Sequence, residues 1–370
     1  MLRRRSRGLP APGRGVGWPL VGMAGAGDGP RVADVTERSR IMPDLRRREF
    51  LAGSLAAGAA ALARADEPRA GTVASAMPRV VIDTHTHFYD PHRPEGVPWP
   101  GKGDPVLYRT VLPAEWEELV APLGVTGTII VEASAWVDDN QWLLDLAAKH
   151  TPRPGMQGIV GIIGNLPLGD EGCGALIDRF ARHPLYQGVR VNAGRLLEGL
   201  DDKAYLADLE RFAGHDLTLD VNGGPVNGAI DRLATRFPAL RIVVEHMGST
   251  RISDAGPEAP WRDAIATVAR HPNVFLKVSA LVESQAHAAG TPKGRADTAY
   301  YEPWLDCVWN AFGTKRLFFG SNWPVSARSG GYADVLGVVT PYVRRQGPDA
   351  ERWFFADASR AAYRWDQRTK

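Results

Sequence analysis

Residues 80–88 read Val-Val-Ile-Asp-Thr-His-Thr-His-Phe, and this stretch sets the interpretation of the rest of the chain. Its first residues are apolar and largely β-branched, which is typical of a strand covered on both faces. Its last residues place His85 and His87 two positions apart. Because side chains at i and i+2 of a strand point to the same side, we expect both imidazoles to face one site, where they can bind one metal ion.

Apolar runs resembling residues 80–83 recur along the chain and alternate with amphipathic stretches. Strands are predicted over residues 80–83, 127–132, 158–163, 188–191, 217–221, 241–245, 274–278 and 316–319. Helices are predicted over residues 140–150, 205–213, 226–237 and 260–270, among others. This alternation predicts an α/β fold with eight strand–helix units, a single-domain (β/α)8 barrel over residues 79–370. A doubly wound sheet is the alternative, but no glycine-rich nucleotide motif follows the first strand.

Composition and charge narrow the class of protein. The chain has 370 residues, of which 44% are hydrophobic and 23% charged, as is typical of a globular protein. Its net charge is +2, but residues 1–65 hold 12 Arg, no Lys and five acidic residues, so the remainder is mildly acidic. An acidic body argues against nucleic-acid binding. Two cysteines, Cys173 and Cys307, are too few for a disulfide framework or a cysteine zinc site, and we expect two separate buried thiols.

The basic N-terminal region has the pattern of an export signal. Residues 46–65 read RRREFLAGSLAAGAAALARA, a basic cluster, a short apolar run and a small-x-small cleavage motif. We interpret residues 42–65 as a twin-arginine signal peptide of a bacterial periplasmic protein, with the twin-arginine export machinery as a partner. Residues 66–78 are a short linker. Residues 1–41 are a Gly/Pro/Arg-rich extension, either disordered or preceding the true start at Met42.

Polar residues follow nearly every predicted strand. The candidates in chain order are Glu132, Ser134, Arg190, Asn192, Asp220, Asn222, Glu245, His246, Lys277, Ser279, Ser321, Asn322 and Trp323. In a barrel the C-terminal ends of the strands share one face, where active sites lie. His246 can supply a third nitrogen beside His85 and His87, and three histidines with an open position suit a zinc ion that activates water.

Five segments together resemble one family of enzymes. They are VIDTHTHF (81–88), Gly-Val-Arg (188–190), VVEHMG (243–248), NVFLKVSAL (273–281) and RLFFGSNWPV (316–325). They occur in the order seen in the amidohydrolase-related family of metal-dependent hydrolases. The chain is most similar to the branch that holds 2-pyrone-4,6-dicarboxylate lactonase and sugar lactonases, and the resemblance runs from about residue 80 to residue 365.

The resemblance implies a distorted (β/α)8 barrel that hydrolyses an ester, lactone or amide at its mouth. It implies that His85, His87 and His246 are the metal ligands and that Arg190 binds a substrate carboxylate. The family's catalytic aspartate after the eighth strand falls on Asn322, which is a departure, because an amide cannot accept a proton from water. From the resemblance and the three histidines we expect a divalent metal, with zinc as the first choice. A metal-independent mechanism is the alternative.

The proton acceptor has to be another residue. Glu132 is the first choice, with Asp220, Glu245 and Glu283 as further acidic candidates and His246 as a non-acidic one. Strand alternation argues against Glu245, since it would point away if His246 points in.

Four other residues are candidates for the site, and two of them, Lys277 and Trp323, have a second interpretation. Lys277 is either an oxyanion partner or half of a buried ion pair. Asn192 and Trp323 are candidate substrate-binding residues, although Trp323 is also a candidate core residue. Trp99, in the Pro- and Gly-rich segment 88–113, is a candidate ring-stacking residue in a loop over the barrel mouth.

We therefore predict an enzyme that hydrolyses a small cyclic ester, or a related carboxylate substrate, at a barrel mouth. Two alternatives stay open: a decarboxylase or hydratase acting on an aromatic or unsaturated acid, and a non-catalytic barrel that binds a small molecule. The expected partner is a small-molecule substrate, and the sequence leaves homo-oligomerisation open.

Overall fold

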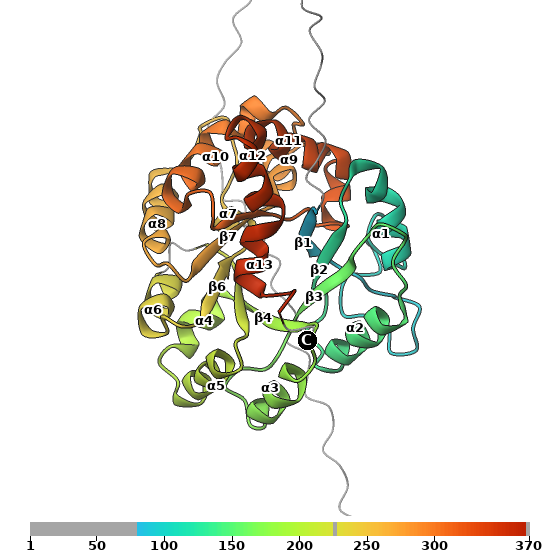
Figure 1. Ribbon diagram of the computed structural model, residues 1–370, viewed down its shortest axis with the longest axis vertical. Coiled ribbons are helices and arrows are strands. Elements are labelled where there is room, and N and C mark those ends of the chain that lie inside the picture. Colours follow the sequence, from blue (N-terminus) through green and yellow to red (C-terminus); the bar gives the residue numbers. More distant parts are fainter. Residues whose placement is uncertain (1–79, 225–227, 368–370) are drawn as a thin grey trace, which may run out of the picture. The chain divides into compact units, whose positions relative to one another are not determined.

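The computed structural model describes residues 80–224 and 228–367, so the predictions for residues 1–41, 42–65 and 66–78 lie outside the described residues. The described part contains eight parallel strands that pair in chain order. They are β1 (Ile82–Thr86), β2 (Gly127–Val131), β3 (Gly158–Gly164), β4 (Tyr186–Asn192), β5 (Thr218–Asn222), β6 (Arg241–Val244), β7 (Val274–Val278) and β8 (Leu317–Phe319). The predicted (β/α)8 barrel is confirmed (Figure 1). The doubly wound alternative is wrong, because the strand order never reverses.

Contacts between β8 and β1 bring the two edges of the sheet together. The Thr84 hydroxyl donates to the Phe319 carbonyl at 2.6 Å, and the His87 amide donates to the Trp323 carbonyl at 2.9 Å. The register shifts within the β1–β2, β2–β3 and β3–β4 pairs, which distorts the barrel on that side. The shift in β1 lies between Asp83 and Thr86, within the segment that carries the first histidine.

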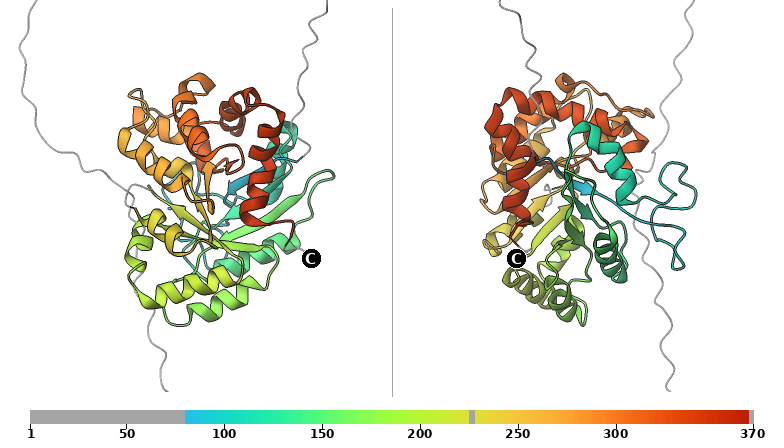
Figure 2. Two further views of the ribbon diagram at one scale, coloured as in Figure 1. Left: turned by 60° about the vertical axis from the view of Figure 1, so that its left-hand side comes forward. Right: turned by 45° about the vertical axis from the view of Figure 1, so that its right-hand side comes forward.

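Helices follow the strands and surround the barrel (Figure 2). The principal ones are α1 (Pro113–Val120), α2 (Asp138–Lys149), α3 (Cys173–Ala181), α4 (Ala193–Gly199), α5 (Lys203–Gly214), α6 (Ala229–Arg236), α8 (Ala259–Ala269), α9 (Leu281–Ala289), α10 (Thr298–Phe312) and α11 (Tyr332–Arg345). The shorter ones are η1 (Ala121–Leu123), α7 (His246–Ser249), η3 (Val325–Arg328), α12 (Pro348–Arg352), η4 (Trp353–Asp357) and α13 (Ala358–Tyr363). The four helices predicted by periodicity are α2, α5, α6 and α8.

Local chemistry explains where several helices begin. Asp202 and Asp297 accept hydrogen bonds from amides three residues on and cap α5 and α10. Pro113 opens α1, where its fixed backbone angle suits a helix and its missing N–H costs nothing.

The barrel interior is closed at one end by the C-terminal helix. Apolar side chains from six strands pack there against α13 and Trp365. Figure 1 shows α13 over the middle of the barrel. The Ala362 carbonyl accepts hydrogen bonds from Thr218 at 2.9 Å and from Arg241 at 2.5 Å. The polar strand ends therefore lie on a barrel whose interior is filled from the opposite side.

The long connection between β1 and α1 is tied at its base. Tyr89 and Val111 pair as an isolated bridge, with backbone hydrogen bonds of 3.0 and 2.9 Å.

Both cysteines are free, as expected; Cys173 is buried, but Cys307 is only partly buried, which corrects that part of the prediction. Among the described residues, none of the helices has the length and apolar character needed to cross a membrane.

Gly320, just after β8, lies where any side chain would press on the histidine site. A Cβ placed on it would lie 2.9 Å from the Cβ of His85 and 3.2 Å from the Cγ of Lys277. We expect Gly320→Ala to lower the free energy of unfolding by about 1–3 kcal/mol, because such overpacking forces a buried strand to shift. Urea denaturation followed by circular dichroism measures it. The matched control is Gly337→Ala within α11, where a Cβ meets nothing within 4 Å, so stability should be unchanged or increased. Equal stabilities for the two variants would contradict this account of the packing.

Candidate active site

Three histidines meet at the C-terminal end of the barrel. His85 and His87 come from the end of β1, and His246 follows β6. The ring centroid of His85 lies 4.9 Å from that of His87 and 4.4 Å from that of His246. His85 and His87 are buried, whereas His246 is partly exposed. The structure thus brings together the three imidazoles that the sequence singled out.

Each of these rings has its Nδ1 atom held by a protein partner. Nδ1 of His85 lies 3.2 Å from Oε1 of Glu245, and Nδ1 of His87 lies 2.9 Å from the Val131 carbonyl oxygen. Nδ1 of His246 lies 2.8 Å from the Ser279 hydroxyl. The Val131 carbonyl oxygen only accepts, so Nδ1 of His87 carries the proton and its Nε2 keeps its lone pair. Nδ1 of His85 also lies 3.3 Å from Nζ of Lys277, which only donates, so Glu245 and Lys277 favour opposite tautomers of this ring.

Burial keeps these histidines uncharged near neutral pH. Desolvation lowers the pKa of His87 to about 3 and that of His246 to about 4. Desolvation also lowers the pKa of His85 well below its ordinary value, despite the opposing effect of Glu245. Neutral imidazoles with a free lone pair are the form that binds metal ions.

Glu245 lies in the site, contrary to the argument from strand alternation. Val243 packs in the barrel interior, so Glu245, two residues on, points the same way. His246 also reaches the site because β6 ends at Val244 and His246 has a φ of 53°, in the left-handed region. Met247 follows with a φ of 55°, so the alternation of a strand does not extend to these positions.

A buried lysine connects Glu245 to the barrel interior. Nζ of Lys277 donates to Asp220 at 2.9 Å and to Glu245 at 3.2 Å, and all three side chains are 0% exposed. Lys277 therefore forms a buried ion pair, which was one of the two roles considered for it from the sequence. Tyr363 of α13 donates to the same Asp220 oxygen at 2.8 Å. Burial raises the pKa of Asp220 to about 7, although Lys277 opposes this.

Arg190 and Glu132 form an ion pair at the barrel mouth. Arg190 donates to Oε1 of Glu132 through Nε at 2.9 Å and through Nη2 at 2.7 Å, and its Nη1 lies 3.6 Å from Glu245. Burial raises the pKa of Glu132 to about 7 against the effect of Arg190. The second oxygen, Oε2, has no hydrogen-bond partner among the described residues. The residue predicted to hold a substrate carboxylate thus already holds a carboxylate of the protein.

Asn322 is paired with another predicted candidate, Glu283 of α9. Its amide nitrogen donates to Oε1 of Glu283 at 3.0 Å. The second oxygen of Glu283 is buried and has no partner within the described ranges. Burial raises the pKa of Glu283 to about 7, more than the bond from Asn322 lowers it.

Two of the predicted substrate-binding residues have other contacts. The side chain of Asn192 caps α4 by accepting from the Gly194 amide at 2.8 Å. Trp323 is 3% exposed and packs against Phe88 in the core, with ring centroids 6.1 Å apart. These contacts do not bring Asn192 or Trp323 to the three histidines.

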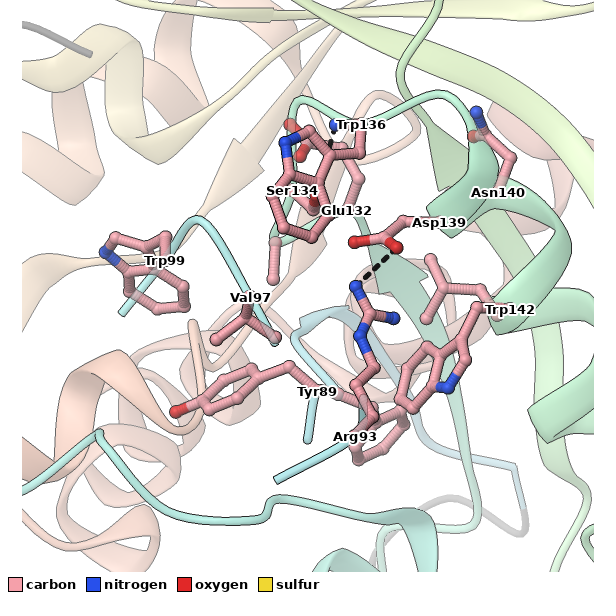
Figure 3. Close-up of a pocket in the computed structure, with 13 residues that line it drawn as sticks. Tyr89, Arg93, Val97, Trp99, Glu132, Ser134, Trp136, Asp139, Asn140 and Trp142 are labelled. Carbon is pink, nitrogen blue, oxygen red and sulfur yellow. Dashed lines mark hydrogen bonds and ion pairs between the residues drawn. The ribbon is translucent and has the colours of Figure 1, made fainter. Parts of the chain in front are cut away.

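A pocket opens beside Glu132, between the β1–α1 connection and α2 (Figure 3). Arg93 lies inside it, where Nη2 donates to Asp139 at 2.5 Å and the guanidinium faces Trp142, 5.1 Å from the ring centroid. The ring of Trp99 lies 5.8 Å from that of His87, so the pocket adjoins the histidines. The lining is Phe88, Tyr89, Arg93, Val97, Trp99, Glu132, Ala133, Ser134, Trp136, Asp139, Asn140, Trp142 and Leu143.

Sequence reasoning missed Tyr363 and the pocket residues Arg93 and Asp139. Tyr363 comes from the last helix, and no local pattern links a helical tyrosine to an aspartate 143 positions away. The Arg93–Asp139 pair joins a loop to the first turn of α2, whereas most candidates named from the sequence lie at the ends of strands. The one available signal was the cluster of tryptophans at 99, 136 and 142.

The residues present fit a bound divalent cation. One possible ligand atom from each of His85, Glu245 and His246 lies within 4.8 Å of the others. Oε1 of Glu245 lies beside His85 and Lys277, whereas its Oε2 has no hydrogen-bond partner among the described residues, so Glu245 can both orient His85 and offer an oxygen to the ion. Nε2 of His85 is buried and has no hydrogen-bond partner among the described residues, so this atom is available as a metal ligand. His87 is not in this group of three, although its Nε2 keeps a lone pair.

Comparison with known proteins identifies the family of the chain. The amidohydrolase family profile matches residues 82–365. An L-fucono-1,5-lactonase of Burkholderia ambifaria is 30% identical over 295 residues, which is 77% of this chain and 96% of the relative. An L-fucono-1,5-lactonase of Burkholderia multivorans is 28% identical over 285 residues, covering 73% of this chain and 91% of that one.

Solved structures give the same result. An amidohydrolase of Burkholderia multivorans with bound zinc is 27% identical, has a TM-score of 0.66, and matches over 77% of this chain and 99% of its own. A 2-pyrone-4,6-dicarboxylic acid hydrolase of Pseudomonas putida, described in its structure as putative, is 20% identical with a TM-score of 0.59, covers 77% and 98%, and shows the fold alone. With a profile match across nearly the whole described barrel, the chain belongs to the amidohydrolase family and is a hydrolase.

Proposed function

We propose that this hydrolase opens the lactone ring of a sugar acid at the barrel mouth. The observation that carries the proposal is the set of three histidines whose Nδ1 atoms are held by the protein, beside the Arg190–Glu132 pair. Such a set can polarise a carbonyl group while neighbouring polar groups bind the rest of the substrate. The names of the two Burkholderia relatives support a 1,5-lactone as the substrate.

In the proposed mechanism, His85, His87 and His246 hold a divalent ion, for which zinc is the first choice. When bound, that ion supplies Lewis acidity toward the lactone carbonyl and the attacking water. The protein's own groups fix the geometry: Glu245 orients His85, Ser279 orients His246, and the Val131 carbonyl orients His87.

Water attack breaks the bond between the carbonyl carbon and the ring oxygen, and a carboxylate must take the proton of the water. We assign this step to Glu283, whose Oε1 is held by Asn322 and whose Oε2 is free to accept. Glu132, the first choice from the sequence, fits less well because its Oε1 accepts two hydrogen bonds from a cation, Arg190. The proton then passes to the departing ring oxygen, which leaves as a hydroxyl.

His85→Ala removes a histidine whose Nε2 is buried and has no hydrogen-bond partner among the described residues. We expect the affinity for zinc to fall by about 100-fold or more, because losing a ligand costs at least as much affinity as losing the group that orients it. The rate of lactone hydrolysis should fall with it. Metal content after dialysis and acid release from L-fucono-1,5-lactone measure the two effects. His287→Ala, an exposed residue of α9, is the control. Full turnover by His85→Ala would rule out its assigned role.

The pH dependence of kcat/KM tests the proton acceptor. Because the pKa of Glu283 is raised to about 7, its carboxylate is lost as the pH falls, so kcat/KM should drop about tenfold per pH unit below that value. Glu283→Gln should abolish most of the activity and this acid limb. Glu132→Gln should keep the limb and mainly raise KM. The reverse pattern, with the limb kept in Glu283→Gln and lost in Glu132→Gln, would move the role to Glu132.

We also propose that residues 42–65 direct export to the periplasm through the twin-arginine pathway. The support is the Arg47-Arg48 pair followed by a short apolar run and Ala63-Arg64-Ala65. We expect periplasmic protein to begin at Asp66, as determined by mass spectrometry of fractionated cells. Substitution of Arg47 and Arg48 together by lysine should leave the uncleaved chain in the cytoplasm. Cleavage that persists in that variant would contradict a twin-arginine signal.

A further inference from the structure

Two groups of opposite charge compete for the same nitrogen atom of His85. Oε1 of Glu245 lies 3.2 Å from Nδ1 of this ring, and Nζ of Lys277 lies 3.3 Å from the same atom. A carboxylate only accepts hydrogen bonds, whereas an ammonium group only donates them. The neutral ring therefore has two alternative tautomers here, and the other contacts of Glu245 and Lys277 decide which one dominates.

The two tautomers of His85 differ in what they offer to a metal ion. With the proton on Nδ1, the ring donates to Glu245 and its Nε2 keeps a lone pair. With Nδ1 accepting from Lys277, the proton lies on Nε2, which then cannot bind a cation. Nε2 is buried and has no hydrogen-bond acceptor among the described residues, so a proton there would lack a protein partner. Only the first tautomer is competent to bind metal.

Asp220 draws the ammonium group of Lys277 away from the ring. Nζ lies 2.9 Å from Oδ2 of Asp220, a shorter distance than the 3.2 Å to Glu245 and the 3.3 Å to His85. The Tyr363 hydroxyl donates to the same Oδ2 at 2.8 Å and so fixes the position of the carboxylate. Hydrogen bonds between oppositely charged groups are roughly twice as strong as neutral ones, so an ionised Asp220 outcompetes the neutral imidazole for the ammonium group.

We propose that Asp220 is a positioning residue that sets the tautomer of His85. By holding Lys277, it leaves Nδ1 of His85 free to donate to Glu245 and Nε2 free to bind the ion. Asp220 touches neither the ion nor the substrate and acts through Lys277. The proposal rests on the metal-binding role of His85 in the proposed function. It also gives Asp220, a candidate proton acceptor from the sequence, a different role.

The test compares a single substitution with a double one. Asp220→Asn keeps the shape of the side chain but removes its charge, so the hold on Lys277 weakens and Nζ turns toward Glu245 and His85. We expect the affinity for zinc to fall by about tenfold, the low end of the loss typical when a partner of a metal ligand is removed. Competition with a chromophoric chelator measures this affinity.

Adding Lys277→Met to Asp220→Asn should restore the affinity for zinc to near the native value. The double variant removes the competing ammonium group without changing the net charge, and neutral residues of similar volume often replace a buried ion pair without loss of stability. A purely structural role of the ion pair predicts the opposite order, because losing both partners would disturb β5 and β7 at least as much as losing one. Asp349→Asn, in an exposed ion pair with Arg352 on α12, is the control for the lost charge.

Nitrogen NMR of the metal-free protein, labelled at histidine, locates the proton without any turnover. The chemical shift of a ring nitrogen separates a protonated from an unprotonated atom, and the spectrum of His85→Ala identifies the signals of His85. The spectra are recorded above the value of about 7 to which burial raises the pKa of Asp220, so that its carboxyl group is ionised. We expect the proton on Nδ1 in the native protein, a larger share on Nε2 in Asp220→Asn, and Nδ1 again in the double variant.

The outcomes separate the two proposals. An unchanged tautomer in Asp220→Asn, or a double variant that binds zinc no better than the single one, overturns the role of Asp220. The proposed function stands in that case if the native protein binds zinc and hydrolyses the lactone. The expected tautomers in a native protein that binds no zinc and opens no lactone overturn the proposed function instead.

Two measurements remain decisive if Asp220→Asn alone does not fold, which circular dichroism shows. A native His85 that carries its proton on Nε2 overturns the role of Asp220 whatever the variants do. The double variant keeps the charge balance of the barrel interior, and an affinity for zinc about tenfold below native in this variant also overturns it, since its His85–Glu245 contact has no competitor.

Discussion

The site depends on the ion pairs that the buried ammonium group of Lys277 makes with Asp220 and Glu245. This group is fully buried, and a charge in that position is tolerated only because Asp220 and Glu245 compensate it. Through these two acids Lys277 ties three neighbouring strands, β5, β6 and β7, into one polar group. Glu245 and Lys277 both lie beside Nδ1 of His85, at 3.2 and 3.3 Å, so this polar group also holds a ring that comes from β1. Removing either partner would leave an uncompensated charge inside the barrel.

Much of the fold is readable from the sequence because parallel strands covered on both faces are continuous apolar runs. All eight strands were predicted near their true positions, although β1 extends to Thr86, since Thr84 and His85 continue the strand despite their polarity. The convergence of the histidines followed from the topology of a barrel. Strand alternation failed at Glu245 because a local change of backbone angle at His246 is not visible in the residue types.

The pairing of side chains was less predictable than their position. Arg190, Glu132, Asn322 and Glu283 were all named from the sequence, but their partners depend on which strand ends face each other across the mouth. Two pairs of expected functional groups bind each other, which changes their chemistry. Arg190 is neutralised by Glu132, and the amide of Asn322 donates to Glu283, a carboxylate that makes no ion pair among the described residues. The pocket lay outside strand-end reasoning altogether, because Arg93 and Asp139 come from a loop and a helix.

The position of α13 bears on how the chain is made. Tyr363 donates to Asp220, and the Ala362 carbonyl accepts from β5 and β6, so the interior of the barrel is completed by residues near the end of the chain. During synthesis the N-terminal part of a domain emerges first, at about 5–20 residues per second. The interior of the strands therefore stays open and partly polar until α13, which follows all eight strands in the chain, has packed against them. Assembly of one end of the barrel thus depends on packing at the opposite end.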